Sequence, residues 1–258
     1  MSFIFHHPFS TTERYPKKVA YFCMEFGIHQ PLKTYAGGLG FLAGSHMRSA
    51  FELKQPIVGI GILWKHGYYT QTRKPDHTMD VLFEEHHYGF LIPTDIRITI
   101  RVSGHPVTAT AFYLPPDIFH TAPVFFLSTD LPENDYLAHT ISHKLYDSNP
   151  ETKTAAAILL GAGGVMLLEK LGWEPDVYHL NESHALPLAF YLYDRYKSPE
   201  KVKEKLVFTN HTPEEAGNQK SSVRFLEKMS FFCNVPQAEL KLLTQDAVTQ
   251  VDHTLTCL

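Results

Sequence analysis

Short apolar runs alternate with helix-like segments along most of this chain, and this alternation restricts the possible folds more than any other feature. The expected strands are residues 18–24, 57–63, 176–180 and 205–209, and the expected helices are residues 41–53, 152–171, 184–196 and a last one from residue 223. This order predicts an α/β fold in which helices cover both faces of a mostly parallel, Rossmann-like sheet. Ligands of such sheets bind beyond the carboxyl ends of the strands, so functional residues are expected directly after strands.

A stretch in the middle of the chain has a different pattern. Residues 96–102 and 107–113 alternate apolar and polar side chains on either side of Ser-Gly-His-Pro at 103–106. This pattern predicts a β-hairpin inserted into the α/β domain. We find no linker or repeat, so residues 1–258 are expected to form one domain.

Composition excludes several classes of protein. Basic and acidic residues number 23 and 27, only 19% of residues are charged, and no basic run occurs, so neither nucleic acid nor an anionic membrane is an expected partner. The three cysteines are widely spaced, which predicts neither a disulfide framework nor a thiolate zinc site. The first residues lack a signal-peptide pattern and no run reaches about 18 apolar residues, so a cytoplasmic protein outside the membrane is expected.

A glycine-rich turn precedes the first expected helix. Residues 36–40 read Ala-Gly-Gly-Leu-Gly, and Gly37 and Gly38 allow a backbone to approach an anion closely. The amides of the helix's first turn attract negative charge, so phosphate is the expected ligand. The spacing differs from that of nucleotide-binding loops, and by itself the motif also fits a purely structural turn.

A second polar cluster directly follows the expected strand at 176–180. Glu182 and His184 place a carboxylate and an imidazole side by side, a pair suited to binding sugar hydroxyls or transferring protons. Ser183 between them is expected to cap the next helix.

A third polar cluster follows the strand at 205–209. Asn210 and His211 stand at its start, and Pro213 and Gly217 are expected to hold the loop in place. A single histidine is more often a structural hydrogen-bonding residue than a functional one. Two such clusters in successive βα units, however, favour a shared site.

His139 and His143 stand four residues apart on a possible helix, a spacing that allows metal binding. No HExxH glutamate accompanies them and the sequence suggests no third ligand. No metal site is therefore expected.

Four motifs in register resemble the α-glucan (glycogen, starch and maltodextrin) phosphorylases. They are Tyr-Phe-Cys-Met-Glu-Phe-Gly at 21–27, Tyr-Ala-Gly-Gly-Leu-Gly-Phe-Leu-Ala-Gly at 35–44, Leu-Asn-Glu-Ser-His at 180–184 and Val-Phe-Thr-Asn-His-Thr-Pro at 207–213. Their order and spacing match the N-terminal half of the family across essentially the whole chain, in the form of the short bacterial type.

The resemblance implies one half of a GT-B fold, with the chain as its N-terminal domain and the C-terminal, cofactor-binding domain absent. The implied reaction is phosphorolysis of terminal α-1,4-glucosidic bonds, with α-1,4-glucan and orthophosphate as substrates and glucose 1-phosphate as product. The implied cofactor is pyridoxal 5′-phosphate, which this chain alone is not expected to hold. Assembly into a homo-oligomer is left open.

The resemblance also implies roles for individual residues. His211 matches the histidine that binds a hydroxyl of the glucosyl unit, and Glu182 and His184 match the acidic residue and histidine of the neighbouring loop, so these three are the expected catalytic residues. Asn210 is expected beside them at the sugar end of the site.

Substrate-binding residues follow by the same comparison. Gly37, Gly38 and Leu39 match the loop that approaches substrate phosphate and the terminal glucose. Glu25 matches a glutamate at the edge of the active site. Residues 153–157, Lys-Thr-Ala-Ala-Ala, depart from the family, which usually has a charged run there.

Two other functions remain open. A nucleotide-sugar glycosyltransferase of the glycogen-synthase kind shares the fold, but those enzymes place a lysine immediately before the glycine loop, and here Lys33 is separated from Gly37 by three residues. A non-catalytic glucan-binding domain is the other alternative. The sequence lacks the row of exposed tryptophans expected of such a domain, since Trp64 and Trp173 stand in apolar context.

Overall fold

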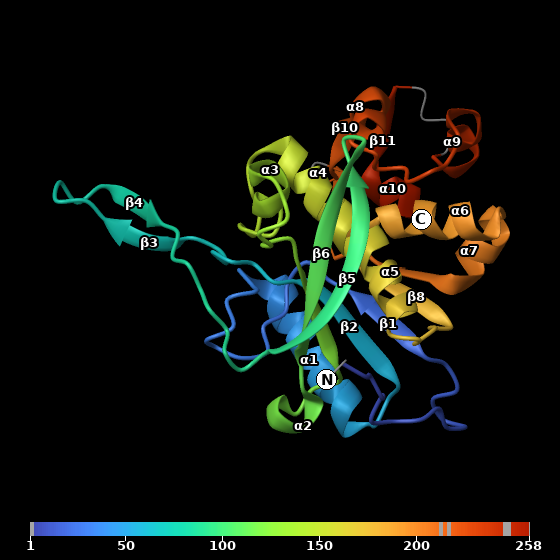
Figure 1. Ribbon diagram of the computed structural model, residues 1–258, viewed down its shortest axis with the longest axis horizontal. Coiled ribbons are helices and arrows are strands. Elements are labelled where there is room, and N and C mark those ends of the chain that lie inside the picture. The colour runs from blue at the N-terminus through green and yellow to red at the C-terminus, as the bar shows by residue number, and fades with distance from the viewer. Residues whose placement is uncertain (1–2, 212–213, 216–217, 245–248, 258) are drawn as a thin grey trace.

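The computed structural model describes residues 3–211, 214–215, 218–244 and 249–257 (Figure 1). Its main sheet has seven strands in the order β5-β6-β7-β2-β1-β8-β9. They are β1 (Val19–Phe22), β2 (Ile57–Ile62), β5 (Ile92–Val102), β6 (His105–Leu114), β7 (Val124–Ser128), β8 (Val177–Asn181) and β9 (Leu206–Thr209). Neighbouring strands in the series β7-β2-β1-β8-β9 pair in parallel. Strand β6 pairs antiparallel with both β5 and β7. The predicted α/β class is confirmed.

The helices predicted near residues 41–53, 152–171, 184–196 and from residue 223 are present, and the described residues form further short helices that the apolar spacing did not predict. They are α1 (Gly38–Glu52), α2 (Pro116–Phe119), α3 (Tyr136–Thr140), α4 (Pro150–Ile158), α5 (Gly164–Lys170), α6 (Pro187–Tyr196), α7 (Pro199–Lys205), α8 (Val223–Lys228), α9 (Gln237–Leu243) and α10 (His253–Cys257). A π-helical segment, η1 (Leu159–Gly163), joins α4 to α5, and a 3₁₀ turn, η2 (Ser183–Ala185), precedes α6. Asn149 starts α4 by accepting a hydrogen bond from the Thr152 amide at 3.0 Å.

Side chains of the central strand point alternately to two separate apolar layers. Ala20 and Phe22 of β1 belong to the layer that includes α4 and α5, whereas Tyr21 and Cys23 belong to the layer that includes α1. Both layers are buried, as the period of two along a strand requires for a sheet covered on each face. The expectation of helices on both faces is therefore confirmed.

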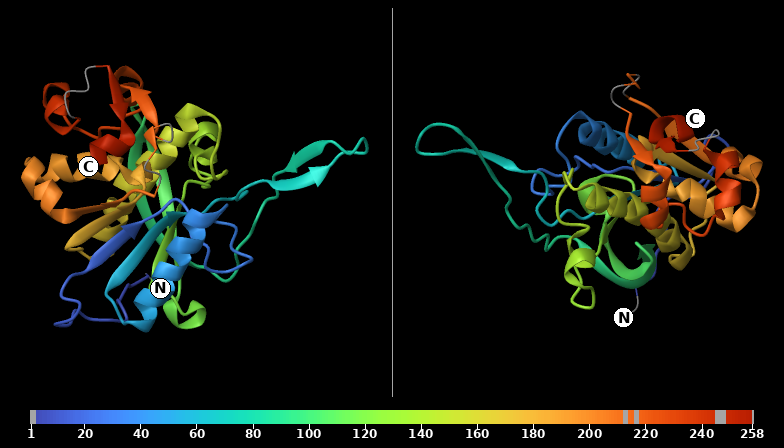
Figure 2. Two further views of the ribbon diagram at one scale, coloured as in Figure 1. Left: turned by 180° about the vertical axis from the view of Figure 1, so that it is seen from behind. Right: turned by 90° about the horizontal axis from the view of Figure 1, so that it is seen from above.

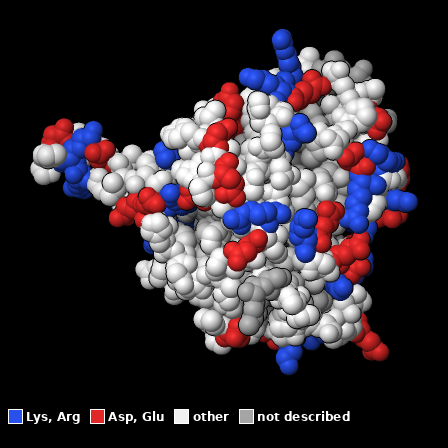
Figure 3. All heavy atoms as spheres, in the orientation of Figure 1, with Lys and Arg blue, Asp and Glu red and all other residues white. Residues whose placement is uncertain are grey.

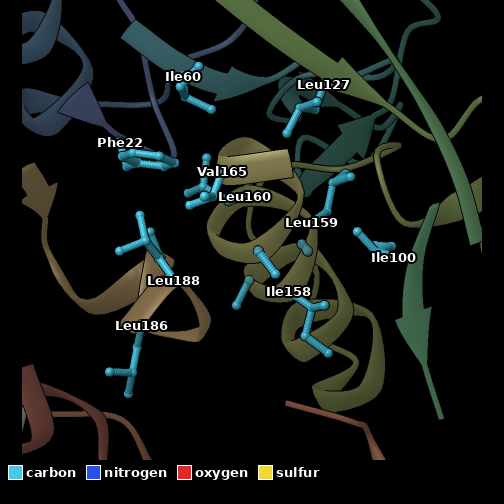
Figure 4. Close-up of a cluster of buried hydrophobic side chains, with 14 of the residues drawn as sticks. Phe22, Ile60, Ile100, Leu127, Ile158, Leu159, Leu160, Val165, Leu186 and Leu188 are labelled. Carbon is cyan, nitrogen blue, oxygen red and sulfur yellow. The ribbon is translucent and has the colours of Figure 1, made fainter. Parts of the chain in front are cut away.

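Small residues let the long helix from α4 to α5 approach its neighbours closely. A Cβ at Gly164 would lie 2.5 Å from Phe22 Cε1 and 2.8 Å from Ile60 Cγ2, so only glycine fits against the sheet there. Figure 4 shows Leu160 and Val165 of this helix lying near Phe22 and Ile60. The small residues in the sequence thus reflect packing.

The same stretch, Pro150–Lys170, is long and apolar enough to cross a membrane, with a mean hydropathy of 1.3 in its most apolar window. Its uninterrupted apolar run covers residues 155–168 and is shorter than about 18 residues, so the expectation that no apolar run of that length occurs agrees with the sequence, although the mean hydropathy of the helix is high. In the structure, 78% of that window is buried, as in the core helix of a globular domain.

The predicted hairpin exists but is not a separate insertion. Strand β6 pairs with β7 from Thr110 to Leu114, so β5 and β6 extend the main sheet at one edge. A different hairpin, β3 (Thr70–Arg73) and β4 (Met79–Leu82), projects away from the body as an arm (Figures 1 and 2). A further small sheet pairs β10 (Lys220–Ser222) with β11 (Gln250–Asp252).

Acidic and basic side chains are interspersed over the face of the molecule in Figure 3. The three cysteines, Cys23, Cys233 and Cys257, are free, in agreement with the prediction of no disulfide framework.

Candidate active site

The carboxyl ends of three adjacent parallel strands meet at one edge of the sheet. Leu180 of β8 pairs with Phe22 of β1 and with Phe208 of β9, so the loops that follow these strands begin at the same level. A pocket of about 610 Å³ opens there. The residues at this edge therefore lie where the α/β architecture predicts a ligand site.

Six of the eight residues predicted for the site line this one pocket. They are Gly38 and Leu39 from the glycine loop, Glu182 and His184 from the loop after β8, and Asn210 and His211 from the loop after β9. Gly37 and Glu25 are not among the described lining residues. The three polar clusters found separately in the sequence thus share one cavity.

Glu25 lies beneath the glycine loop. Its side chain is only 2% exposed, and Oε2 accepts hydrogen bonds from the amides of Ala36 at 2.6 Å and Gly37 at 3.1 Å. Its other oxygen accepts a hydrogen bond from the Tyr146 hydroxyl. The geometry therefore gives Glu25 and Gly37 a part in positioning the loop, while their contact with substrate stays a prediction.

Gly38 and Gly40 of the loop differ in what they do for the fold. A Cβ at Gly40 would lie 2.4 Å from Tyr35 Cβ, so packing requires a glycine there. A Cβ at Gly38 would meet nothing within 4 Å, and the backbone of Gly38 does not adopt a positive φ. Neither packing nor a positive φ therefore requires a glycine at position 38, and the open side of its backbone belongs to the pocket wall.

Helix α1 begins at this loop and presents its amino end to the pocket. No side chain caps that end, and its first turn contains no acidic residue. The first amides of a helix lack intrahelical partners and carry the positive end of the helix dipole. The Gly38 and Leu39 end of the pocket is therefore suited to an anion.

Glu182 holds a backbone conformation that residues other than glycine rarely adopt, with φ 65° and ψ 171°. Hydrogen bonds on both sides fix it, because the Glu182 amide donates to Thr209 O at 3.0 Å and the His211 amide donates to Glu182 Oε1 at 2.6 Å. Such strain costs about 1–3 kcal/mol and is typical of functional sites. The two hydrogen bonds of Glu182 join the loop after β8 to the end of β9 and its loop at the pocket wall.

A hydrogen bond to a buried asparagine orients the His211 ring. Its Nε2 lies 2.6 Å from Oδ1 of Asn181, a residue that is 1% exposed. The Asn181 amide donates in turn to Cys23 Sγ at 3.1 Å. Because Oδ1 can only accept, Nε2 of His211 is the donor, and this fixes both the tautomer and the direction of the ring.

His184 brings a neutral imidazole to the pocket. Burial lowers its pKa, although Glu182 and Glu25 act in the opposite direction. Its Nδ1 is buried and has no hydrogen-bond partner within the described part of the chain. A buried polar atom without a partner is costly, and a ligand hydroxyl or water would satisfy it.

Sequence reasoning missed part of the wall. Tyr146, Gln219 and Thr254 also line the pocket, and no local motif marks them; Leu42 lines it too and lies within the motif at 35–44, but no role was expected for it. Ser183 lines it as well, and neither η2 nor α6 has a side-chain cap, so the capping role expected for Ser183 is wrong.

The loop that carries His211 is described only in part. Pro213 and Gly217, which the sequence analysis expected to hold this loop, lie outside the described residues.

The pocket walls offer two kinds of chemistry. Glu182, His184, Asn210 and His211 present groups that accept and donate hydrogen bonds, as recognition of sugar hydroxyls requires. No lysine or arginine lines the pocket among the residues that the structure describes. An anion would thus be bound by the amino end of α1.

A family model described as the starch synthase catalytic domain matches residues 63–256. The match covers the strands and loops that carry Glu182, His184 and His211, but it begins after the glycine loop. With the observed sheet, it supports the prediction of one half of a GT-B fold.

Similar proteins include archaeal and bacterial chains. The uncharacterized protein MJ1631 of Methanocaldococcus jannaschii is 46% identical over 219 residues, which is 85% of this chain and 42% of that protein. Maltodextrin phosphorylase of Thermococcus litoralis is 35% identical over 85% of this chain and 28% of its own length. Glycogen phosphorylase of Mycobacterium tuberculosis is 28% identical over 83% of this chain and 27% of its own length. The chain thus spans less than half the length of these relatives.

Proposed function

The chain belongs to the glycosyltransferase family represented by the starch synthase catalytic domain, and from this premise we propose that it forms the substrate-binding half of an α-glucan phosphorylase. The proposed reaction transfers the terminal α-1,4-linked glucose of a glucan to orthophosphate and releases glucose 1-phosphate. The observation that carries the proposal is the single pocket shared by the glycine loop and the two histidine-bearing loops. Relatives named maltodextrin phosphorylase and glycogen phosphorylase support it.

The sugar would lie against the loops after β8 and β9. Cleavage of a glycosidic bond passes through a transition state with positive charge on the sugar ring. The carboxylate of Glu182 lines the pocket and offsets such charge. His211, held by Asn181, and His184, with its unpartnered Nδ1, supply hydrogen bonds of fixed direction to the hydroxyls.

Orthophosphate would lie at the opposite wall. The uncapped amino end of α1 offers amides and a favourable dipole at Gly38 and Leu39. The missing side chain at Gly38 lets the anion approach the backbone. Glu25 keeps the preceding turn in place through its bonds to Ala36 and Gly37.

Pyridoxal 5′-phosphate, which phosphorylase activity implies, does not fit the residues present. A Schiff base needs a lysine amine, and none of the described residues that line the pocket carries one. On this proposal the cofactor is held by the part of the longer protein that lies outside this chain. The chain by itself is then expected to bind sugar and phosphate weakly and to lack activity.

A nucleotide-sugar glycosyltransferase is the second candidate, because the matching family model describes starch synthases. The position of Lys33 opposes it. Its side chain is exposed and lies outside the described pocket lining, and its backbone amide donates a hydrogen bond to the Tyr88 hydroxyl at 3.2 Å. A lysine positioned to bind a nucleotide sugar would face the pocket.

A non-catalytic glucan-binding domain is supported less well. A row of exposed tryptophans for stacking on sugars would favour it, but Trp64 is 1% and Trp173 is 7% exposed. Neither tryptophan offers a face to a glucan.

The test measures glucose 1-phosphate released from maltodextrin by the natural protein that carries this chain, with and without orthophosphate. The proposal expects release that requires orthophosphate and that falls at least a hundredfold in His211→Asn. His77→Asn is the matched control, because His77 is exposed on the arm and its φ of 67° suits asparagine. Glucosyl transfer from ADP-glucose without orthophosphate would instead support the synthase alternative.

A further inference from the structure

Three side chains of the kind that bind metal ions meet outside the pocket, beyond the end of β7. Asp130 follows that strand, His139 lies in α3, and His143 lies in the turn after α3. One ligand atom from each lies within 4.8 Å of the other two. Sequence reasoning found no third ligand for the histidine pair because Asp130 reaches it only through the tertiary fold.

We propose that Asp130, His139 and His143 form a site for a divalent transition-metal ion, with Zn²⁺ as the ion that fits best. Two imidazoles and one carboxylate are a donor set that Zn²⁺ accepts in tetrahedral geometry, with a fourth position for water. Hard ions such as Mg²⁺ prefer oxygen ligands and disfavour a pair of imidazoles.

The distances within the cluster are close to what a tetrahedral ion requires. Asp130 Oδ1 lies 2.5 Å from His139 Nε2 and 3.7 Å from His143 Nε2. Bonds of about 2.0–2.1 Å in a tetrahedron place ligand atoms about 3.3 Å apart. The two separations from Asp130 Oδ1 thus differ from this value by less than about 1 Å, and the two histidine nitrogens lie within 4.8 Å of each other.

The Asp130 carboxylate is oriented for this purpose by its other oxygen. Lys65 Nζ lies 3.0 Å from Asp130 Oδ2 and 3.1 Å from Glu85 Oε1. A ligating carboxylate is commonly held by such an outer contact. Lys65 also lies 3.3 Å from Oδ1, and Glu85 offsets the charge that its ammonium brings near an ion.

The backbone around the ligands is fixed by cross-links between the segments. The Thr129 amide donates to Ser142 Oγ at 3.0 Å, and the His66 amide donates to His143 O at 2.8 Å. The Asp130 amide donates to Ser128 Oγ at 3.1 Å. The ligand positions are thus largely set before an ion binds.

His143 gives a separate indication. Its Nε2 is buried and has no hydrogen-bond partner among the residues described. An orphaned nitrogen that faces a carboxylate oxygen and a second imidazole is accounted for when an ion lies between them. The side chains remain 17–32% exposed, which leaves a path from solvent.

An ion there would tie the end of β7 to the segment after α3. That segment reaches Tyr146 three residues after His143, and Tyr146 lines the pocket and bonds Glu25. A bound ion would therefore stabilise the position of the segment that carries Tyr146 into the pocket wall. This effect does not depend on which reaction the pocket performs.

The test is calorimetric titration of Zn²⁺ into the chelator-treated chain at neutral pH. The proposal expects one ion per chain, with affinity at least tenfold weaker in Asp130→Asn, His139→Asn and His143→Asn, and unchanged in the control His77→Asn. Equal affinity in the control and the three ligand variants, or no binding to the unsubstituted chain, would overturn it.

Co²⁺ bound to the unsubstituted chain provides a measurement that does not depend on how the variants fold. We expect the visible absorption of tetrahedral Co²⁺ to saturate at one ion per chain and to disappear when Zn²⁺ is added. A spectrum of octahedral Co²⁺ that Zn²⁺ does not displace would contradict the site.

Discussion

Replacing Gly38 and Gly40 with alanine, one at a time, separates what the fold needs from what a ligand needs. In Gly40→Ala the new Cβ would lie 2.4 Å from Tyr35 Cβ and 3.0 Å from Glu25 Oε2. Overpacking of this kind costs about 1–3 kcal/mol of unfolding free energy. Gly38→Ala meets nothing within 4 Å and needs no change of φ, so it should raise stability by about 0.4–1 kcal/mol through the unfolded state.

Although Gly38→Ala should not lower the stability of the chain, it should weaken ligand binding. Its Cβ would enter the pocket where a ligand approaches the backbone, so we expect the affinity of the natural protein for maltodextrin with orthophosphate to fall at least tenfold. Urea unfolding of the chain and calorimetric titration measure the two quantities. Gly89→Ala is the control, because a Cβ there also meets nothing within 4 Å and Gly89 lies outside the described pocket lining.

If Gly38→Ala binds as tightly as the unsubstituted protein and the Gly89→Ala control, no ligand approaches the backbone at Gly38. If Gly38→Ala destabilises the chain as much as Gly40→Ala does, Gly38 has a structural role that its surroundings do not show, which would equally contradict the prediction.

Three further predictions concern stability. Gly164→Ala should lower the unfolding free energy by about 1–3 kcal/mol in urea titrations, because its Cβ would lie 2.5 Å from Phe22 Cε1; an unchanged midpoint would contradict the close packing. Glu182→Gly should be about 1–2 kcal/mol more stable than Glu182→Ala, since both lose the carboxylate and only glycine relieves the φ of 65°; equal midpoints would show that the backbone there is unstrained. Burial lowers the pKa of His253 to about 4, so between that value and about 6.5 the unfolded state binds a proton that the folded state does not, and stability should fall as pH falls through this range. The contribution of His253 is about 2 kcal/mol between pH 7 and pH 5, and His253→Gln should remove it from the pH dependence of thermal unfolding.

Much of the sheet was predictable because central strands such as β2 are buried on both faces. Runs such as Ile57–Ile62 are continuously apolar, which distinguishes them from their surroundings without any tertiary information. The polar clusters after β8 and β9 were found because parallel strands bring their carboxyl ends to one edge. That rule needs only the order of the elements.

The arm and the partners of the site could not be predicted in the same way. Strand β4 is exposed at every residue, so no apolar period marks it. The contact of Tyr146 with Glu25 joins residues 121 positions apart, and the meeting of Asp130 with the two histidines depends on how α3 returns to the sheet. Such contacts come from tertiary packing, and a local pattern carries no signal of them.

Glu25 shows how far a sequence motif predicts the role of a side chain. Its motif indicated a place at the active site, but only the coordinates show that its carboxylate accepts hydrogen bonds from the glycine loop and lies 2% exposed. A sequence motif therefore identified the neighbourhood, and the structure identified what the side chain does there.

Nuclear magnetic resonance of the isotopically labelled chain, titrated with maltodextrin and orthophosphate together, addresses the shared pocket directly. If the glycine loop and the two later loops bind one ligand set, the Gly38 amide and the rings of His184 and His211 will shift with a single saturation curve. Shifts confined to one of these three places, or saturating at different concentrations, would mean that the three loops do not form a common binding site.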